Sequence, residues 1–137
     1  MEATLTKKKV ILVIEDDHDV NDLVCDALDE AGFVTLAAFD GSEGMKLTCE
    51  ERPDVILMDI ILPDTDGIEI CRNINRDDAT RGIPIIMLTG RQDLSTKLSS
   101  YIAGARRYIT KPFRIEDLIA EVEKTIRQRE NTEREEV

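Results

Sequence analysis

Residues 55–67 read VILMDIILPDTDG, and this stretch decides the fold. Its first four residues are apolar, as in a strand that is buried on both faces of a parallel sheet. The strand ends at Asp59, and a loop rich in turn-forming residues leads into a helix over 68–75. The stretch therefore predicts one strand–loop–helix unit with a carboxylate at the carboxyl end of the strand.

The same unit recurs along the rest of the chain. Short apolar runs predict further strands over 10–14, 34–38, 84–88 and 107–109. Apolar residues at helical spacing predict further helices over 20–31, 41–51, 94–103 and 116–128. Five strands that alternate with five helices predict an α/β fold, with parallel pairing, right-handed crossovers and helices on both faces of the sheet.

Length and composition limit the class of protein. The 137 residues fit one domain, expected over 9–128, between a disordered N-terminus (1–8) and a frayed acidic end (129–137). The net charge of −11 argues against direct binding of nucleic acid, because phosphates attract basic surfaces. No apolar run of about 18 residues and no signal-peptide stretch is present, so we expect a cytoplasmic protein without membrane contact. The cysteines have no metal-site spacing and are expected to be buried or half-buried thiols: Cys25, Cys49 and Cys71.

Polar side chains stand at the carboxyl ends of the predicted strands, which is where open parallel sheets bind ligands. The first strand ends in Glu15 and Asp16, the third in Asp59 and the fourth in Thr89, and Lys111 follows the fifth. If the first and third strands are neighbours, the carboxylates converge and repel one another unless a cation lies among them. Oxygen ligands of this kind suit Mg²⁺, with Mn²⁺ as the alternative.

This set of side chains suits phosphoryl transfer to a carboxylate. Asp59 would be the nucleophile, while Lys111 and Thr89 would contact the phosphoryl oxygens. The sequence contains no phosphate-binding glycine loop. The donor is therefore expected to arrive activated, as a phosphohistidine or a small acyl phosphate, rather than as bound ATP.

Four motifs occur in order along the chain: ILVIEDD (11–17), VILMDIILPDTDG (55–67), PIIMLTG (84–90) and YITKPF (108–113). With these motifs, the sequence resembles the receiver domain of two-component response regulators over about 9–128. The resemblance implies a flavodoxin-like, doubly wound (βα)5 fold with a five-stranded parallel sheet in the order 2-1-3-4-5. It also suggests a stand-alone receiver similar to the chemotaxis regulators.

The resemblance assigns a role to each residue of the site. It implies that Asp59 is the phosphoacceptor and that Mg²⁺ is bound by Glu15, Asp16, Asp59 and the backbone carbonyl of Ile61. The remaining roles are a switch hydroxyl, a cationic side chain, a switch aromatic and a cis peptide bond, carried by Thr89, Lys111, Tyr108 and the Lys111–Pro112 bond, respectively.

The same resemblance implies partners and a mode of action. The donor would be a sensor histidine kinase or a histidine phosphotransfer protein, and the chain would catalyse only its own phosphorylation and dephosphorylation. Phosphorylation would change the face around the fourth helix, fifth strand and fifth helix, which would regulate an unknown downstream protein.

Two features depart from the family pattern. Arg106 and Arg107 stand where many receivers joined to winged-helix domains carry acids that form a dimer. The chain is therefore expected to be a monomer or a weak dimer, and this face could meet an acidic partner. Ile61 and Arg91, two residues after the acceptor and the hydroxyl, suggest slow hydrolysis of the acyl phosphate.

Three other functions stay open at this point. A phosphohydrolase with an aspartyl nucleophile would need a second acid where Ile61 stands. A flavodoxin-like cofactor binder would need Ser or Thr contacts after the first strand, where the acidic run 15–17 would repel the phosphate. A receiver-like scaffold that is never phosphorylated is disfavoured by the complete set of acids, Thr89 and Lys111.

Several residues beside the predicted site are expected to have structural roles only. His18 is expected to face solvent rather than carry phosphate, and Asp17 suits the N-cap of the first helix. Asp64 and Asp66 are expected to be turn formers. Gly67 is expected to supply a backbone conformation that the turn needs.

Overall fold

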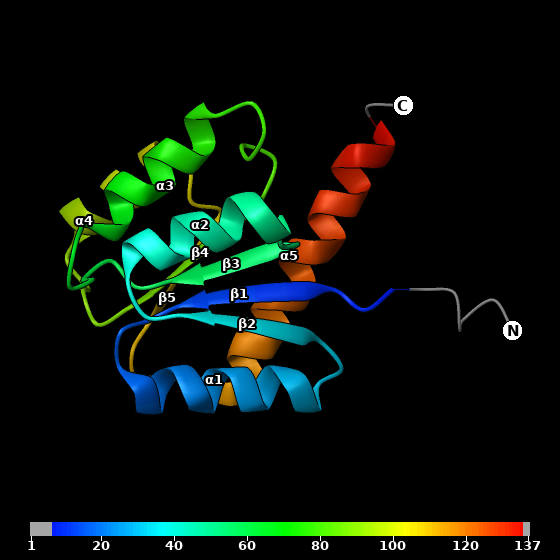
Figure 1. Ribbon diagram of the computed structural model, residues 1–137, viewed down its shortest axis with the longest axis horizontal. Helices are drawn as coiled ribbons and strands as arrows, with labels where there is room; N and C mark the ends of the chain where they lie inside the picture. Colours follow the sequence, from blue (N-terminus) through cyan, green and yellow to red (C-terminus); the bar gives the residue numbers. More distant parts are fainter. Residues whose placement is uncertain (1–6, 136–137) are drawn as a thin grey trace, which may run out of the picture.

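The computed structural model describes residues 7–135, which form a parallel sheet between two layers of helices (Figure 1). The sheet contains five strands in the order β2-β1-β3-β4-β5. The flavodoxin-like fold and the predicted strand order are thus confirmed. The strands are β1 (Val10–Ile14), β2 (Val34–Ala38), β3 (Val55–Met58), β4 (Ile85–Thr89) and β5 (Arg107–Thr110). The helices are α1 (His18–Glu30), α2 (Gly41–Glu51), α3 (Gly67–Arg76), α4 (Leu94–Ala103) and α5 (Ile115–Glu135).

The buried side chains of the sheet divide into two cores because successive residues of a strand point to opposite faces. In β3, for example, Ile56 and Met58 pack with residues of α2, α3 and α4, whereas Val55 and Leu57 pack with residues of α1 and α5. Strands β1 and β4 alternate in the same way. Burial on both faces explains why these strands appear in the sequence as continuous apolar runs.

Aspartate side chains fix the beginnings of α1 to α4. The N-cap residues are Asp17, Asp40, Asp66 and Asp93, and each accepts a hydrogen bond from a backbone N–H in the first turn of its helix. A carboxylate at this position satisfies a free N–H and interacts favourably with the helix dipole. Because each helix follows a strand, the caps hold the helix starts at the same edge of the sheet as the strand ends.

Helix α5 continues to Glu135, so the described part of 129–137, where a frayed end was expected, is helical. Arg129 holds this part of α5 near the beginning of β3, because its Nη1 donates to the carbonyl of Asp54 at 3.0 Å. An ion pair of 3.3 Å between Lys9 and Glu130 adds a second tether. Disorder was also expected for residues 1–6, but these residues and residues 136–137 lie outside the described part of the chain. Residues 7 and 8 have no regular secondary structure.

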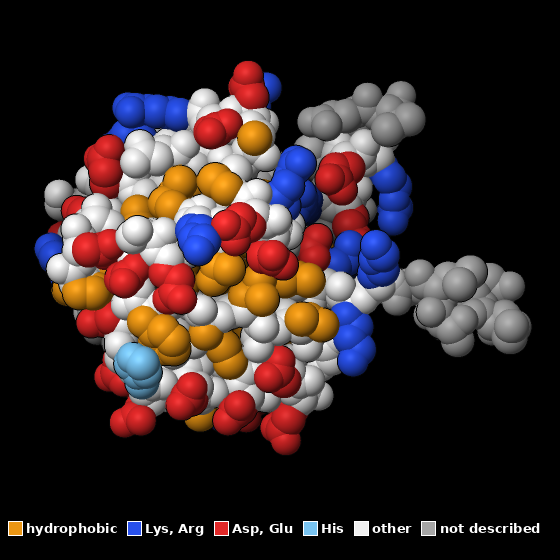
Figure 2. Space-filling view, viewed as in Figure 1, with side chains coloured by type: hydrophobic (Ala, Val, Ile, Leu, Met, Phe, Trp, Pro, Cys, Tyr) orange, Lys and Arg blue, Asp and Glu red, His pale blue; other side chains and the backbone are white. Residues whose placement is uncertain are grey.

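Acidic side chains are frequent on the face of the molecule shown in Figure 2. Helix α1 contains no Lys or Arg, and its exposed acids are Asp19, Asp22, Asp26, Asp29 and Glu30. Figure 2 shows acidic side chains along the lower edge of the molecule, where α1 lies in Figure 1. Within residues 7–135, no helix is long and apolar enough to cross a membrane.

The cysteines differ in their surroundings more than was expected. Cys71 is buried and Cys25 is half-buried, but Cys49 is exposed, so its predicted burial is wrong. Helical periodicity does not identify this position, because the face of α2 that packs on the sheet is lined by small residues, including Gly44 and Thr48.

Reaction with a thiol reagent at neutral pH should therefore separate the three cysteines. Burial raises the pKa of Cys71 to about 11 and also raises that of Cys25. Because the thiolate is the reactive form, Cys49 should react quickly and Cys71 only after unfolding. Ellman's reagent should show a fast phase that the substitution Cys49→Ser removes. Equal rates for Cys49 and Cys71 in the folded protein would contradict this expectation.

Candidate functional site

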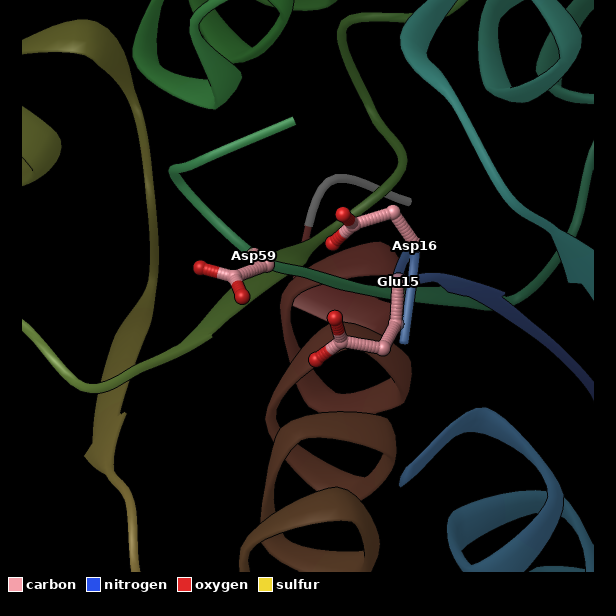
Figure 3. A group of neighbouring side chains, drawn as sticks. All are labelled: Glu15, Asp16 and Asp59. Atoms are coloured by element: carbon pink, nitrogen blue, oxygen red, sulfur yellow. The ribbon is translucent and has the colours of Figure 1, made fainter. Parts of the chain in front are cut away.

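Three carboxylates meet at the carboxyl ends of β1 and β3 (Figure 3). Glu15 and Asp16 follow β1, and Asp59 follows β3, which is the neighbour of β1 in the sheet. One carboxylate oxygen of each residue lies within 4.8 Å of the others. Glu15 is 2% exposed and Asp59 is 8% exposed, while Asp16 is open to solvent. The predicted cluster of acids is therefore formed.

Lys111 lies between the two buried acids of this cluster. Its Nζ donates to Glu15 Oε1, and to Asp59 Oδ2 at 2.9 Å. Burial raises the pKa of Glu15 above its usual value, although the hydrogen bond from Lys111 opposes this shift. Burial also acts to lower the pKa of Lys111, but the hydrogen bonds to Glu15 and Asp59 outweigh it and raise the pKa. The ammonium group is thus held in its charged form beside Asp59.

Asn21 supports the cluster from α1, and the sequence reasoning missed it. Its side chain is fully buried, and Nδ2 donates to the carbonyls of Glu15 at 3.1 Å and Ala38 at 3.2 Å. These bonds tie the end of β1 to the end of β2 and fix the backbone of Glu15. The sequence did contain a signal for this role, because Asn21 is a polar residue on the apolar face of a predicted helix.

The loop between β3 and α3 folds tightly beside Asp59. The backbone N–H of Ile61 donates to Asp59 Oδ1 at 3.2 Å, and the N–H of Gly67 donates to the carbonyl of Ile60 at 2.7 Å. A Cβ atom on Gly67 would lie 2.3 Å from the backbone oxygen of Asp59. Gly67 is therefore required for close approach, and not for a special conformation as expected, because its φ is not positive.

A chain of hydrogen bonds joins Thr89 to Tyr108. Thr89 ends β4 with its side chain fully buried, and Oγ1 accepts from the N–H of Arg91 at 3.3 Å. The carbonyl of Arg91 accepts from the hydroxyl of Tyr108 at 2.6 Å. Lys97 Nζ lies 5.6 Å from the centre of the Tyr108 ring. The β4–α4 loop thus connects the end of the sheet to the surface at α4 and β5.

Other residues near this edge have structural surroundings. His18 faces solvent, as expected, and its ring stacks on Phe39 with 4.0 Å between centroids. The peptide bond between Lys111 and Pro112 is cis.

The charges at 106 and 107 are not equivalent. Arg107 donates to Glu121 Oε1 and Thr125 Oγ1, both at 3.0 Å, so its charge is used within the domain. Arg106 is exposed. The sequence reasoning treated both charges as available to a partner, and only that of Arg106 is.

The family model for the response regulator receiver domain matches residues 11–123. The chain belongs to this family. It is 38% identical over 117 residues to the DNA-binding dual master transcriptional regulator RpaA of Synechocystis sp., covering 85% of this chain and 48% of that protein. It is 37% identical over 119 residues to the phosphate regulon transcriptional regulatory protein PhoB of Pseudomonas aeruginosa, covering 87% of this chain and 52% of that protein. The receiver thus spans about half the length of these curated relatives.

Solved receiver structures have the same architecture. A CheY-like receiver domain protein from Methanospirillum hungatei matches with a TM-score of 0.88 at 29% identity, over 92% of this chain and 99% of that chain. The BeF3-activated DrrB receiver domain matches with a TM-score of 0.79 at 31% identity, over 88% of this chain and 99% of that chain.

The donor atoms of the receiver site fit a hard divalent cation. Glu15, Asp16 and Asp59 offer only oxygen ligands, and Lys111 offsets only part of their negative charge. Oxygen ligands in this number are typical of Mg²⁺, which keeps several waters when it binds to proteins. The acidic cluster is therefore suited to the Mg²⁺ that receivers use.

Addition of Mg²⁺ should raise the melting temperature of the protein. At about ten times its Kd, a ligand that binds only the folded state stabilises it by about 1.4 kcal/mol, which is about 5 °C here. The shift should be smaller at about pH 5 than at about pH 7.5, because the raised pKa of Glu15 lets protons compete for the site. Differential scanning fluorimetry checks both effects. Asp78→Asn, at an exposed acid paired with Arg81, should respond like the wild type, and an undiminished shift in Glu15→Gln would contradict the assignment.

Proposed function

We propose that this receiver is a phosphoacceptor switch in which Asp59 becomes an aspartyl phosphate. The observation that carries the proposal is the position of the Asp59 carboxylate, which is nearly buried, lies beside Glu15 and Asp16, and is held by Lys111. A carboxylate in this environment is available as a nucleophile while cationic groups lie next to the incoming phosphoryl oxygens.

The transfer takes place from a phosphohistidine of a sensor histidine kinase or a histidine phosphotransfer protein. A carboxylate oxygen of Asp59 attacks phosphorus, the P–N bond of the donor breaks, and the imidazole leaves with the electron pair of that bond. Lys111, already bonded to Asp59, donates to a phosphoryl oxygen of the product. Bound Mg²⁺ supplies neutralisation of the phosphoryl charge. Beyond its own phosphorylation and the hydrolysis of its acyl phosphate, the chain catalyses no reaction.

The signal passes from Thr89 to Tyr108. When the Thr89 hydroxyl turns to the phosphoryl group, it gives up its bond to the N–H of Arg91. The β4–α4 loop then moves, and the Tyr108 hydroxyl loses its partner, the carbonyl of Arg91. The β4–α4 loop thus has two states, and phosphorylation shifts the equilibrium between them.

The exposed side of α4 supports the assignment of the output face to α4, β5 and α5. Large apolar side chains stand in one row of this helix, with Leu94 at 69%, Leu98 at 52% and Ile102 at 83% exposure. Such a row is typical of a surface that contacts another protein. We propose that an unidentified downstream protein in the cytoplasm binds there, with the receiver itself a monomer or a weak dimer.

Treatment with beryllofluoride and Mg²⁺ tests the switch. Activation by BeF3 is named for the similar DrrB receiver, so the same reagent is suitable here. The expected result is a change in the fluorescence of Tyr108, followed in a Tyr101→Phe background so that it is the only tyrosine. Thr89→Val should bind the reagent without the tyrosine change. A wild type that does not respond would instead support a scaffold that is never phosphorylated.

A further inference from the structure

The β3–α3 loop, residues 59–66, contacts the beginning of α2 as well as the functional site. Asp64 is at the tip of this loop, and its carboxylate accepts two backbone hydrogen bonds from α2. Oδ1 accepts from Gly41 N–H at 2.8 Å, and Oδ2 accepts from Ser42 N–H at 2.9 Å. These bonds lower the pKa of Asp64, with the bond from Gly41 as the largest cause. The loop is thus fastened to a helix that is remote from it in sequence.

The start of α2 does not need Asp64 as its ordinary cap. Asp40 already accepts from the N–H of Glu43 at 2.7 Å, and Glu43 returns a bond through Oε1, which accepts from Phe39 N–H at 2.9 Å. This pair is a variant of the capping box, in which the glutamate bonds to the N–H of the residue before the N-cap. Asp64 satisfies different N–H groups of the first turn, so its contribution is a connection between two elements.

A second contact, without charge, joins the same two elements. A Cβ atom on Gly41 would lie 2.4 Å from Thr65 Cγ2 and 2.6 Å from Ile70 Cδ1. Real Cβ atoms do not approach other atoms so closely, so the absence of a side chain at Gly41 lets the loop pack directly on α2.

The base of the loop transmits this attachment to Asp59. Ile61 pairs with Asp66 in an antiparallel bridge, and the N–H of Ile61 donates to Asp59 Oδ1. Asp66 in turn caps α3 through the N–H of Ile68 at 2.8 Å. Because these contacts restrain the loop between its tip and the acceptor carboxylate, movement of the tip displaces the groups around Asp59.

We propose that Asp64 is a positioning residue, which holds the β3–α3 loop on α2 and so sets the geometry of the Mg²⁺ site around Asp59. The inference rests on the proposed function, because it concerns the same site. It replaces the expectation that Asp64 only forms a turn. Outer-shell residues that orient metal ligands change metal affinity by about 10- to 100-fold when replaced, and we expect the lower end for a residue that acts through a loop.

Mg²⁺ titration of four variants, followed by amide NMR spectra, tests the proposal. Asp64→Ala should weaken Mg²⁺ binding by about 10-fold. Asp64→Asn, which keeps an oxygen acceptor, should recover part of this loss. Gly41→Ala moves the loop from the α2 side without changing the charge and should also weaken binding. Asp40→Ala is the matched control, because it removes a cap of the same helix but has no bond to the loop.

The pattern across the variants decides between explanations. Unchanged Mg²⁺ affinity in Asp64→Ala, with normal binding by the wild type, would overturn the positioning role and leave the proposed function intact. Equal losses in Asp64→Ala and Asp64→Asn, with none in Gly41→Ala, would show that only charge matters and would also overturn it. An equal loss in Asp40→Ala would reduce Asp64 to a helix cap. A wild type that does not bind Mg²⁺ would overturn both the positioning role and the proposed function.

Discussion

Replacement of Asp59 by Asn should abolish phosphoryl uptake. The amide is uncharged and has a much weaker oxygen nucleophile, while its size leaves the surrounding packing intact. With acetyl phosphate and Mg²⁺, the intact mass of the wild type should rise by one phosphoryl group and that of Asp59→Asn should not change. Circular dichroism would show that the variant is folded.

Two controls make this result specific. Asp78→Asn removes an exposed acid that follows the C-terminal end of α3, and this variant should keep normal phosphoryl uptake. His18→Ala removes the single histidine, which faces solvent near the site, and should also keep normal uptake. If Asp59→Asn were still labelled and His18→Ala were not, the acceptor would be the histidine.

Gly67→Ala should both destabilise the protein and impair the site. The new methyl group would lie 2.3 Å from the Asp59 carbonyl oxygen and 2.9 Å from Ile60 Cα, so the backbone must shift. Forced rearrangement of a packed region costs about 1–3 kcal/mol, occasionally more, and here the shift falls on the acceptor residue itself. Urea unfolding should show the loss of stability, and fluorimetry should show a smaller response to Mg²⁺.

Gly82→Ala is the matched control for this substitution. Apart from Gly82 itself and its two chain neighbours, no residue has an atom within 4 Å of a Cβ placed on Gly82, and the φ of Gly82 is not positive. The change should therefore alter the free energy of unfolding by no more than about 0.5 kcal/mol, or stabilise the protein slightly. Equal effects of the two substitutions would mean that close approach to Asp59 is not the reason for Gly67.

The sheet and its acidic edge could be predicted because their signals are local. Strands buried on both faces appear as apolar runs, and each run ends on the residue that the sheet carries to its functional edge. Glu15 and Asp59 could thus be brought together from the sequence once β1 and β3 were taken as neighbours. The same logic placed Lys111 at this edge, but its bonds to Glu15 and Asp59 were not predicted.

Contacts made by the β3–α3 loop and by the end of α5 could not be predicted. The bonds of Asp64 to α2 join residues 22 and 23 positions apart, and nothing in the loop specifies them. The length of α5 depends on Arg129 and the carbonyl of Asp54, 75 positions earlier. Gly67 was correctly singled out, but only three-dimensional packing distinguishes a need for space from a need for conformation.

The inner side of α4 has a consequence for the cost of moving this helix. It rests on the domain through Thr96, Ser100 and Ala103, which are small. The hydroxyl of Ser100 donates to the carbonyl of Thr96, and that of Thr96 donates to the N-cap Asp93, so both bonds travel with the helix. When α4 shifts as a rigid body, both hydroxyls therefore keep their hydrogen bonds, and little apolar surface becomes exposed. Movement of α4 therefore costs little free energy, whereas the strands beneath it are held in place by large buried side chains.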